Sequence, residues 1–113
     1  MNDHIKTRRA SGTYVIRAAG AVIGETQNAI ELTEGDYDPV IYFPRGDIVM
    51  AILEPSATST HCPHKGDATY YGIAAKSGLI ADAAWSYESP QSHVAAIAGH
   101  LAFYTDKVTV EAL

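Results

Sequence analysis

Apolar and polar residues alternate in short runs along most of the chain, and glycine, proline and aspartate separate these runs. Most runs contain β-branched and aromatic residues, which is typical of strands, and they are too short for long helices. Residues 13–17 and 21–23 lie on either side of Ala19-Gly20 and predict a first hairpin. Residues 29–33 follow a period of two, which predicts a third strand with one face in solvent.

The middle of the chain begins with a strand predicted over residues 40–43. Pro44 ends this strand, because proline cannot donate a hydrogen bond to a sheet. Residues 45–47 predict a tight turn. The apolar run at residues 48–53 fits either a buried strand or a short helix, since periodicity does not separate the two for so short a run. We favour a helical turn that leads into a strand.

A second hairpin is predicted where two β-favouring runs surround a short connection with proline and glycine. Its strands are residues 58–62 and 68–73, and its bend is residues 63–66. A further strand is expected at residues 79–85, after the turn at Ser77-Gly78.

The last part of the chain contains the best helix candidate, residues 90–96, where proline is tolerated in the first turn and alanine favours continuation. Residues 97–104 and 108–110 predict a third hairpin. Eight or nine short strands with turns between them are typical of an all-β sandwich or barrel-like domain, here with one or two short helical turns. We expect a compact single domain at residues 13–113, preceded by a loosely ordered polar tail at residues 1–12.

Composition supports one folded domain and excludes several classes of protein. The 113 residues are 47% hydrophobic and 19% charged, which is close to the globular average. The net charge of -5 argues against nucleic-acid binding, which requires a basic surface. No run approaches the roughly 20 apolar residues that a bilayer span needs, and no apolar leader is visible. The single cysteine excludes an intramolecular disulfide, and we expect a cytoplasmic protein.

The densest cluster of reactive side chains lies at residues 60–67, at the bend of the predicted second hairpin. Cys62 and His64 have the spacing of half a Rieske iron–sulfur site, but the second cysteine and histidine pair is absent. A mononuclear site is not favoured either, because His61 and Cys62 are strand neighbours and should point to opposite faces. We therefore predict no metal and no cofactor.

Two kinds of chemistry remain open at this cluster. Lys65, His64 and Arg45 are cations that would favour the thiolate form of Cys62 and make it a nucleophile, whereas lone cysteines are usually buried and inert. Arg45, Lys65 and the backbone amides of the turn would also suit a carboxylate or phosphate. In that second interpretation, the aromatic residues Tyr42, Tyr70 and Trp85 would form the apolar wall of a ligand pocket.

The chain also resembles a known family through four ordered blocks that together span residues 13–111. The family is DUF427, a bacterial domain of unknown function that carries a nucleotidyltransferase-like label. The resemblance implies a fold similar to the Mss4-like or β-tent group. It rests on residues 42–47, 60–70, 82–87 and 97–104, and the positions that match the family pattern are Tyr42, Arg45, Asp47, Thr60, Cys62, Pro63, Lys65, Gly66, Tyr70, Trp85, Tyr87 and Tyr104.

Three functions follow from these observations. The first is binding of a small anionic ligand near the bend at residues 62–66, with Tyr42, Arg45, Asp47, Thr60, Tyr70 and Trp85 as ligand-binding residues. The second is an enzyme that uses Cys62 as nucleophile or redox centre, with Lys65 beside it. The third is a non-catalytic interaction module, including a homodimer formed through a sheet edge. Nucleotidyl transfer is not predicted, because no glycine-rich phosphate loop or paired acidic motif is present.

Overall fold

The computed structural model describes residues 4–113 and confirms an all-β protein. Within this range the chain forms antiparallel strands joined by turns and short 3-10 helices. The strands are β1 (Ile5–Arg9), β2 (Tyr14–Ala18), β3 (Ala21–Thr26), β4 (Ile30–Glu34), β5 (Val40–Tyr42), β6 (Leu53–Cys62), β7 (Gly66–Ala75), β8 (Gly78–Tyr87), β9 (Ala102–Phe103) and β10 (Thr109–Ala112), and the 3-10 helices are η1 (Arg45–Asp47), η2 (Met50–Ile52) and η3 (Ser92–Ile97).

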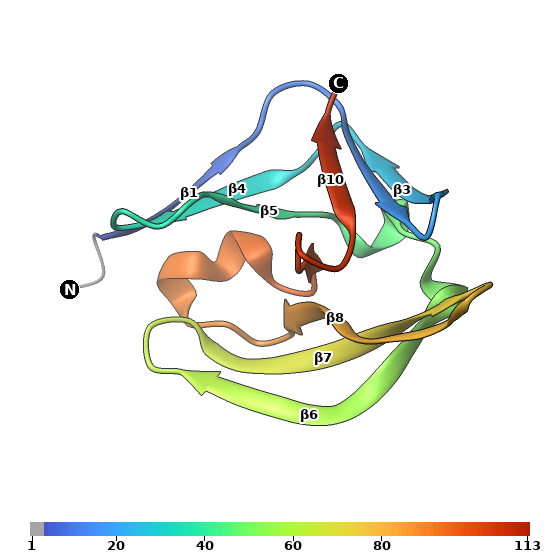
Figure 1. Cartoon of the computed structure of the whole chain (residues 1–113). Helices are drawn as coiled ribbons and strands as arrows, with labels where there is room; N and C mark the ends of the chain where they lie inside the picture. The colour runs from blue at the N-terminus through green and yellow to red at the C-terminus, as the bar shows by residue number, and fades with distance from the viewer. Residues whose placement is uncertain (1–3) are drawn as a thin grey trace.

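The described strands form three sheets, in the orders β1-β4-β5, β10-β2-β3 and β6-β7-β8-β9. Figure 1 shows β6, β7 and β8 as a lower layer and β1, β4 and β5 as an upper layer, with η3 between the two. Isolated bridges connect the sheets at Gly24↔Ile48 and Phe43↔Leu101. The upper and lower layers therefore meet through backbone hydrogen bonds as well as through side-chain packing.

Local turn chemistry explains the two hairpins that the sequence predicts correctly. Ala19 and Gly20, between β2 and β3, both have positive φ angles of 50° and 83°, as a tight two-residue hairpin turn requires. In the second hairpin, Cys62 pairs with Gly66, so that the cluster at residues 60–67 lies at the bend as expected. Gly66 has a φ of 122°, which a residue with a side chain rarely adopts.

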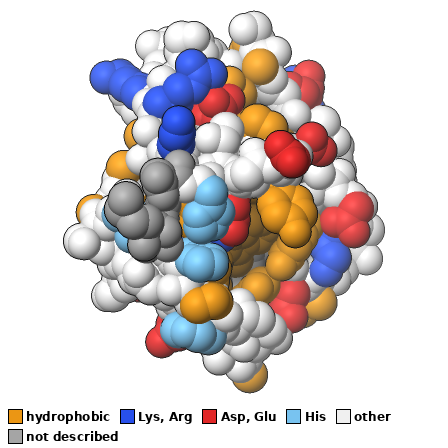
Figure 2. Space-filling model, turned by 90° about the vertical axis from the view of Figure 1, so that its left-hand side faces the viewer, with side chains coloured by type: hydrophobic (Ala, Val, Ile, Leu, Met, Phe, Trp, Pro, Cys, Tyr) orange, Lys and Arg blue, Asp and Glu red, His pale blue; other side chains and the backbone are white. Residues whose placement is uncertain are grey.

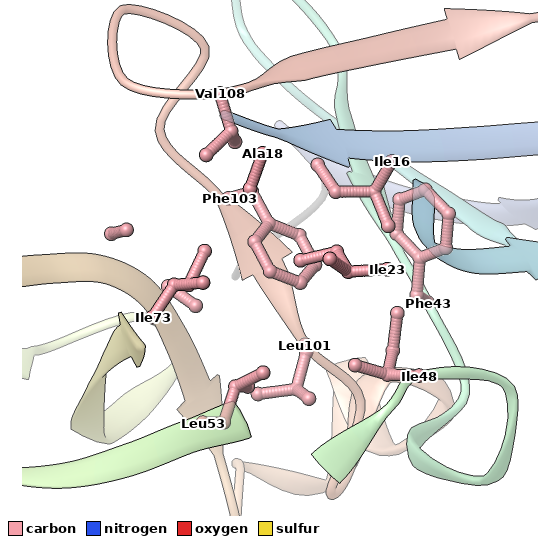
Figure 3. Close-up of a cluster of buried hydrophobic side chains, with 12 residues drawn as sticks. Ile16, Ala18, Ile23, Phe43, Ile48, Leu53, Ile73, Leu101, Phe103 and Val108 are labelled. Atoms are coloured by element: carbon pink, nitrogen blue, oxygen red, sulfur yellow. The ribbon is translucent and has the colours of Figure 1, made fainter. Parts of the chain in front are cut away.

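Two groups of buried side chains form the core. The first core cluster joins buried side chains of β2, β3, β6, β7, β8 and β9 with others from the connections, and Phe43 and Phe103 meet edge to face within it, with ring centroids 5.8 Å apart (Figure 3). The second core cluster lies between the upper and lower layers, around η3. It consists of Ile5, Leu32, Tyr42, Ala68, Tyr87, Val94, Ile97 and Ala102, with Cys62, Tyr70 and Trp85 among the half-buried residues packed against it.

Two expectations about the ends of the chain are wrong. Residues 5–9 are not a loose tail: they form β1, which pairs with β4 from Ile5↔Glu34 to Arg9↔Ile30 and buries Ile5. Residues 1–3 of that expected tail lie outside the described residues. The third hairpin does not form either, since β9 pairs with β8 whereas β10 pairs with β2. A short helix does form at the candidate residues 90–96, as the 3-10 helix η3, which a kink at Val94 interrupts.

No helix in the part of the chain that the structure describes has the length and apolar character needed to cross a bilayer. The similarity to the Mss4-like group stays a prediction. The helical turn expected before the sixth strand is confirmed as η2, which leads directly into β6.

Candidate functional site

A pocket of about 480 Å³ opens between the upper and lower layers, at the end of the molecule where the β4–β5 turn and the β6–β7 bend lie. Figure 2 views this end and shows a hollow whose floor is mostly hydrophobic, a class that includes tyrosine in the colouring used. Its volume is within the range of small-molecule sites. The lining residues are Leu32, Glu34, Tyr37, Asp38, Val40, Tyr42, Lys65, Tyr70, Trp85, Tyr87 and Tyr104.

The period of two along each strand places these side chains on one surface. Trp85 and Tyr87 are two residues apart on β8, and Trp85 lies opposite Tyr70 of β7. On the upper layer, Leu32 of β4 lies opposite Val40 of β5, and Glu34 is two residues further along β4. Seven lining residues therefore come from β4, β5, β7 and β8, and the other four, Tyr37, Asp38, Lys65 and Tyr104, come from the connections between strands.

The aromatic rings of the pocket contact one another. The Trp85 and Tyr104 ring centroids are 4.6 Å apart with a tilt of 45°, and the Tyr70 and Tyr104 rings are nearly parallel with centroids 6.5 Å apart. Trp85 also meets Tyr42 at an angle of 87°, and its Nε1 donates a hydrogen bond of 3.2 Å to the Tyr42 hydroxyl. These contacts fix the orientation of the aromatic wall.

The phenol groups of Tyr42, Tyr87 and Tyr104 are neutral at physiological pH. Burial raises the pKa of Tyr104 to about 12, and a hydrogen bond with Tyr70 adds to the effect. Burial also raises the pKa of Tyr42 and of Tyr87 above the ordinary value. The wall thus offers ring faces and hydroxyl groups but no negative charge of its own.

Lys65 and Glu34 form an ion pair inside the pocket, with Nζ and Oε1 2.6 Å apart and with 12% and 24% of their side chains exposed. Burial opposes the charge on Lys65, but the hydrogen bond with Glu34 and the neighbouring Cys62 outweigh it and raise the Lys65 pKa above its ordinary value. The Lys65 ammonium also lies 5.9 Å from the centre of the Tyr87 ring. Lys65 is therefore charged, and its charge is matched by Glu34.

The turn that carries Lys65 is held in place by the segment before η3. The Gln91 backbone N–H donates to the Lys65 carbonyl at 2.9 Å, and the Gln91 side chain donates to the Pro63 carbonyl at 2.7 Å. The bend that carries Lys65 is consequently held by a segment that is distant in sequence.

The rim of the pocket includes Tyr37 and Asp38 in the turn between β4 and β5. Tyr37 is 78% exposed, which is unusual for so large an aromatic side chain. The Asp38 side chain is exposed and makes no hydrogen bond or ion pair with any residue in the described range 4–113. Within the described part of the chain, this turn thus presents one free ring and one free carboxylate at the entrance.

The structure brings together four of the residues that the sequence analysis assigned to a site, since Tyr42, Lys65, Tyr70 and Trp85 all line the pocket. Thr60 is not a lining residue, but its hydroxyl is 2.9 Å from that of Tyr70. Arg45, Asp47 and Cys62 are not among the lining residues.

Arg45 belongs to a separate network on the surface of the molecule. Its Nη2 lies 2.9 Å from a Glu88 carboxylate oxygen, and its Nε donates to the Gly99 carbonyl at 3.0 Å. Nη1 donates to the Tyr71 hydroxyl at 3.3 Å, and the guanidinium lies 5.6 Å from the centre of the Tyr71 ring. Asp47 accepts a hydrogen bond of 2.7 Å from the Thr26 hydroxyl. Both side chains have partners that hold η1 against neighbouring strands.

Cys62 is half-buried and packs against the second core cluster. Its neighbour His61 is exposed, and His61 Nδ1 lies 2.7 Å from Asp67 Oδ1. The two side chains therefore point to opposite faces of β6, as strand geometry requires. Among residues 4–113, no group of three or more histidine, cysteine, aspartate and glutamate side chains is arranged to hold a metal ion.

Several lining residues were not predicted from the sequence. Tyr87 could have been assigned to the site, because it is two residues from Trp85 in a predicted strand. Glu34, Tyr37 and Asp38 carried no signal, because only the pairing of the upper layer brings the β4–β5 turn over β7 and β8. Tyr104 follows β9 and reaches the pocket only because β9 pairs with β8.

The fold and the pocket define a small all-β protein with an aromatic-lined cavity between two sheets. The family model of the domain of unknown function DUF427 matches residues 6–112, and the chain belongs to this family. No match was found among curated proteins. The resemblance stated from the four sequence blocks is thereby confirmed, whereas the activity of the protein has to be argued from the pocket.

Proposed function

We propose that this protein binds a small organic molecule in the pocket between the β4–β5 and β7–β8 strands. The observation that carries the proposal is the aromatic wall of Tyr70, Trp85 and Tyr104 beside a buried ion pair. Apolar pockets with a few fixed polar groups are the usual form of small-molecule sites. The wall would bury the apolar part of the ligand, and the polar groups would orient it.

An anionic ligand is the second candidate, and Lys65 is the observation that favours it. One Lys65 donor is used by Glu34, and an ammonium group has three, so a carboxylate or phosphate could accept a further hydrogen bond. Arg45 would not assist, because its guanidinium is outside the pocket and is already paired with Glu88. The anion would thus have a single cationic contact among the described lining residues.

The enzyme and interaction-module hypotheses stay predictions. For the first, Cys62 lies near Lys65 but is packed against the second core cluster, and His61 faces the other way. For the second, β6 is an edge strand whose pairing with β7 is irregular between Pro55 and Ser59, a feature that blunts an edge against further pairing. Neither arrangement supports its function as well as the pocket supports ligand binding.

A fragment screen that is balanced in charge tests the proposal, and Trp85 serves as its reporter because it is the only tryptophan in the chain. Ligands of the pocket are expected to change Trp85 fluorescence. Their affinity should fall roughly 3- to 10-fold in Tyr104→Ala, because a stacked aromatic contact contributes about 0.5–1.5 kcal/mol.

Tyr14→Ala is the matched control, since Tyr14 is a half-buried tyrosine outside the pocket. Fragments that bind the two variants equally well, or a complete lack of fragments that perturb Trp85, would contradict the proposed function.

A further inference from the structure

We infer that the ligand of this pocket carries a positively charged ammonium group, which the aromatic rings and the rim carboxylate recognise together. The inference rests on the proposed function and adds the chemical class of the ligand. It follows from the charges of the lining residues, from the ring faces and from the exposure of the β4–β5 turn.

The charges of the described lining residues favour a cation. They comprise two carboxylates, Glu34 and Asp38, and one ammonium group, that of Lys65. Glu34 and Lys65 neutralise each other across 2.6 Å, so the remaining charge is the negative charge of Asp38. An anion entering the pocket would approach both carboxylates, whereas a cation would gain the unpaired one.

The aromatic residues favour the same kind of ligand. Faces of tryptophan and tyrosine rings attract cations electrostatically, and a quaternary ammonium group is a well-suited partner because it is weakly hydrated. Two rings of this pocket already bind cations of the protein itself: Lys65 lies 5.9 Å from the Tyr87 ring, and Lys107 lies 5.7 Å from the Tyr104 ring. Because the phenols keep raised pKa values, this attraction persists throughout the physiological pH range.

The β4–β5 turn places the remaining groups at the entrance. Tyr37 is 78% exposed and is followed directly by Asp38, whose carboxylate has no partner in residues 4–113. A ring and a carboxylate on one turn, facing the wall that contains Tyr70 and Trp85, form the elements of an aromatic cage for an ammonium group. An exposed tyrosine at this position has no packing role that would explain it otherwise.

Three probes of nearly equal shape test the inference: choline, its neutral carbon isostere neohexyl alcohol, and the anion tert-butylacetate. Binding is measured by Trp85 fluorescence, and pocket occupancy is verified by the NMR shifts of the lining residues. Choline is expected to bind at least about 10-fold more tightly than neohexyl alcohol, which corresponds to about 1.4 kcal/mol.

Substitutions at the rim separate charge from shape. Asp38→Asn is expected to weaken choline binding about 2- to 5-fold and to leave neohexyl alcohol binding unchanged. Asp36→Asn is the matched control, because Asp36 is an exposed carboxylate in the same turn that does not line the pocket. Tyr37→Leu should weaken choline binding, and Tyr37→Phe should retain it, since the ring face and not the hydroxyl makes the contact.

Equal binding of choline and neohexyl alcohol would overturn the inference and leave the proposed function intact. Tightest binding of tert-butylacetate would overturn it in favour of the anionic ligand. If none of the three probes binds but other fragments occupy the pocket, only the inference fails. If no fragment of any charge occupies the pocket, the proposed function fails as well.

Discussion

Replacing Arg45 with alanine tests whether this side chain stabilises the fold or binds a ligand. The substitution removes the hydrogen bond to the Gly99 carbonyl, the ion pair with Glu88 and the contact with the Tyr71 ring. A charged hydrogen bond at a partly exposed site contributes about 1–1.5 kcal/mol, the exposed ion pair about 0.5–1 kcal/mol and the cation–π contact about 0.5 kcal/mol. We therefore expect a loss of about 2–3 kcal/mol in the free energy of unfolding.

Urea unfolding followed by Trp85 fluorescence measures this loss, and the affinity of the folded variant for a pocket ligand should stay unchanged. Arg17→Ala is the control, because Arg17 and Glu111 form an ion pair of 2.5 Å in which both side chains are more than 40% exposed. It should lose at most about 1 kcal/mol. A stability loss equal to that of the control would refute the network argument. A tenfold fall in ligand affinity at unchanged stability would return Arg45 to the binding site.

Three further predictions concern the bend, the pH dependence and the thiol. Gly66→Ala should lower the free energy of unfolding in urea by about 1–3 kcal/mol, because Gly66 has a φ of 122°. Gly46→Ala is the control and should be nearly neutral, since Gly46 has neither a positive φ nor close neighbours. Equal effects would contradict the strain argument. The free energy of unfolding should be constant up to about pH 10 and then fall towards pH 12. Folding raises the pKa values of Tyr104 and Lys65, so the unfolded chain loses these protons at a lower pH than the folded protein does. A constant free energy of unfolding up to about pH 12 would disprove this. Packing of Cys62 against the second core cluster should make its alkylation by iodoacetamide much slower in the folded than in the unfolded protein, and rapid alkylation of the folded protein would support the cysteine-dependent enzyme instead.

Short-range features of the fold could be predicted from the sequence. The hairpin turn at Ala19 and Gly20 and the bend that ends at Gly66 depend on residues within a few positions of one another, so local conformational preferences determine them. The pairing of β10 with β2 joins Thr109 to Arg17, and nothing in either segment marks the other as its partner. The N-terminal strand β1 was missed for the same reason, since its polar residues become a strand only beside β4.

The candidate site, like the fold, could be predicted from the sequence only in part. From the sequence alone, Tyr42, Lys65, Tyr70 and Trp85 could be predicted to lie together, because they stand in recognisable blocks with suitable chemistry, and all four line the pocket. The position of Arg45 outside the pocket and of the β4–β5 turn at its entrance could be seen only in the folded structure. The pocket forms between two layers, so the pairing of distant strands determines which side chains face each other across it. No local sequence pattern encodes that pairing.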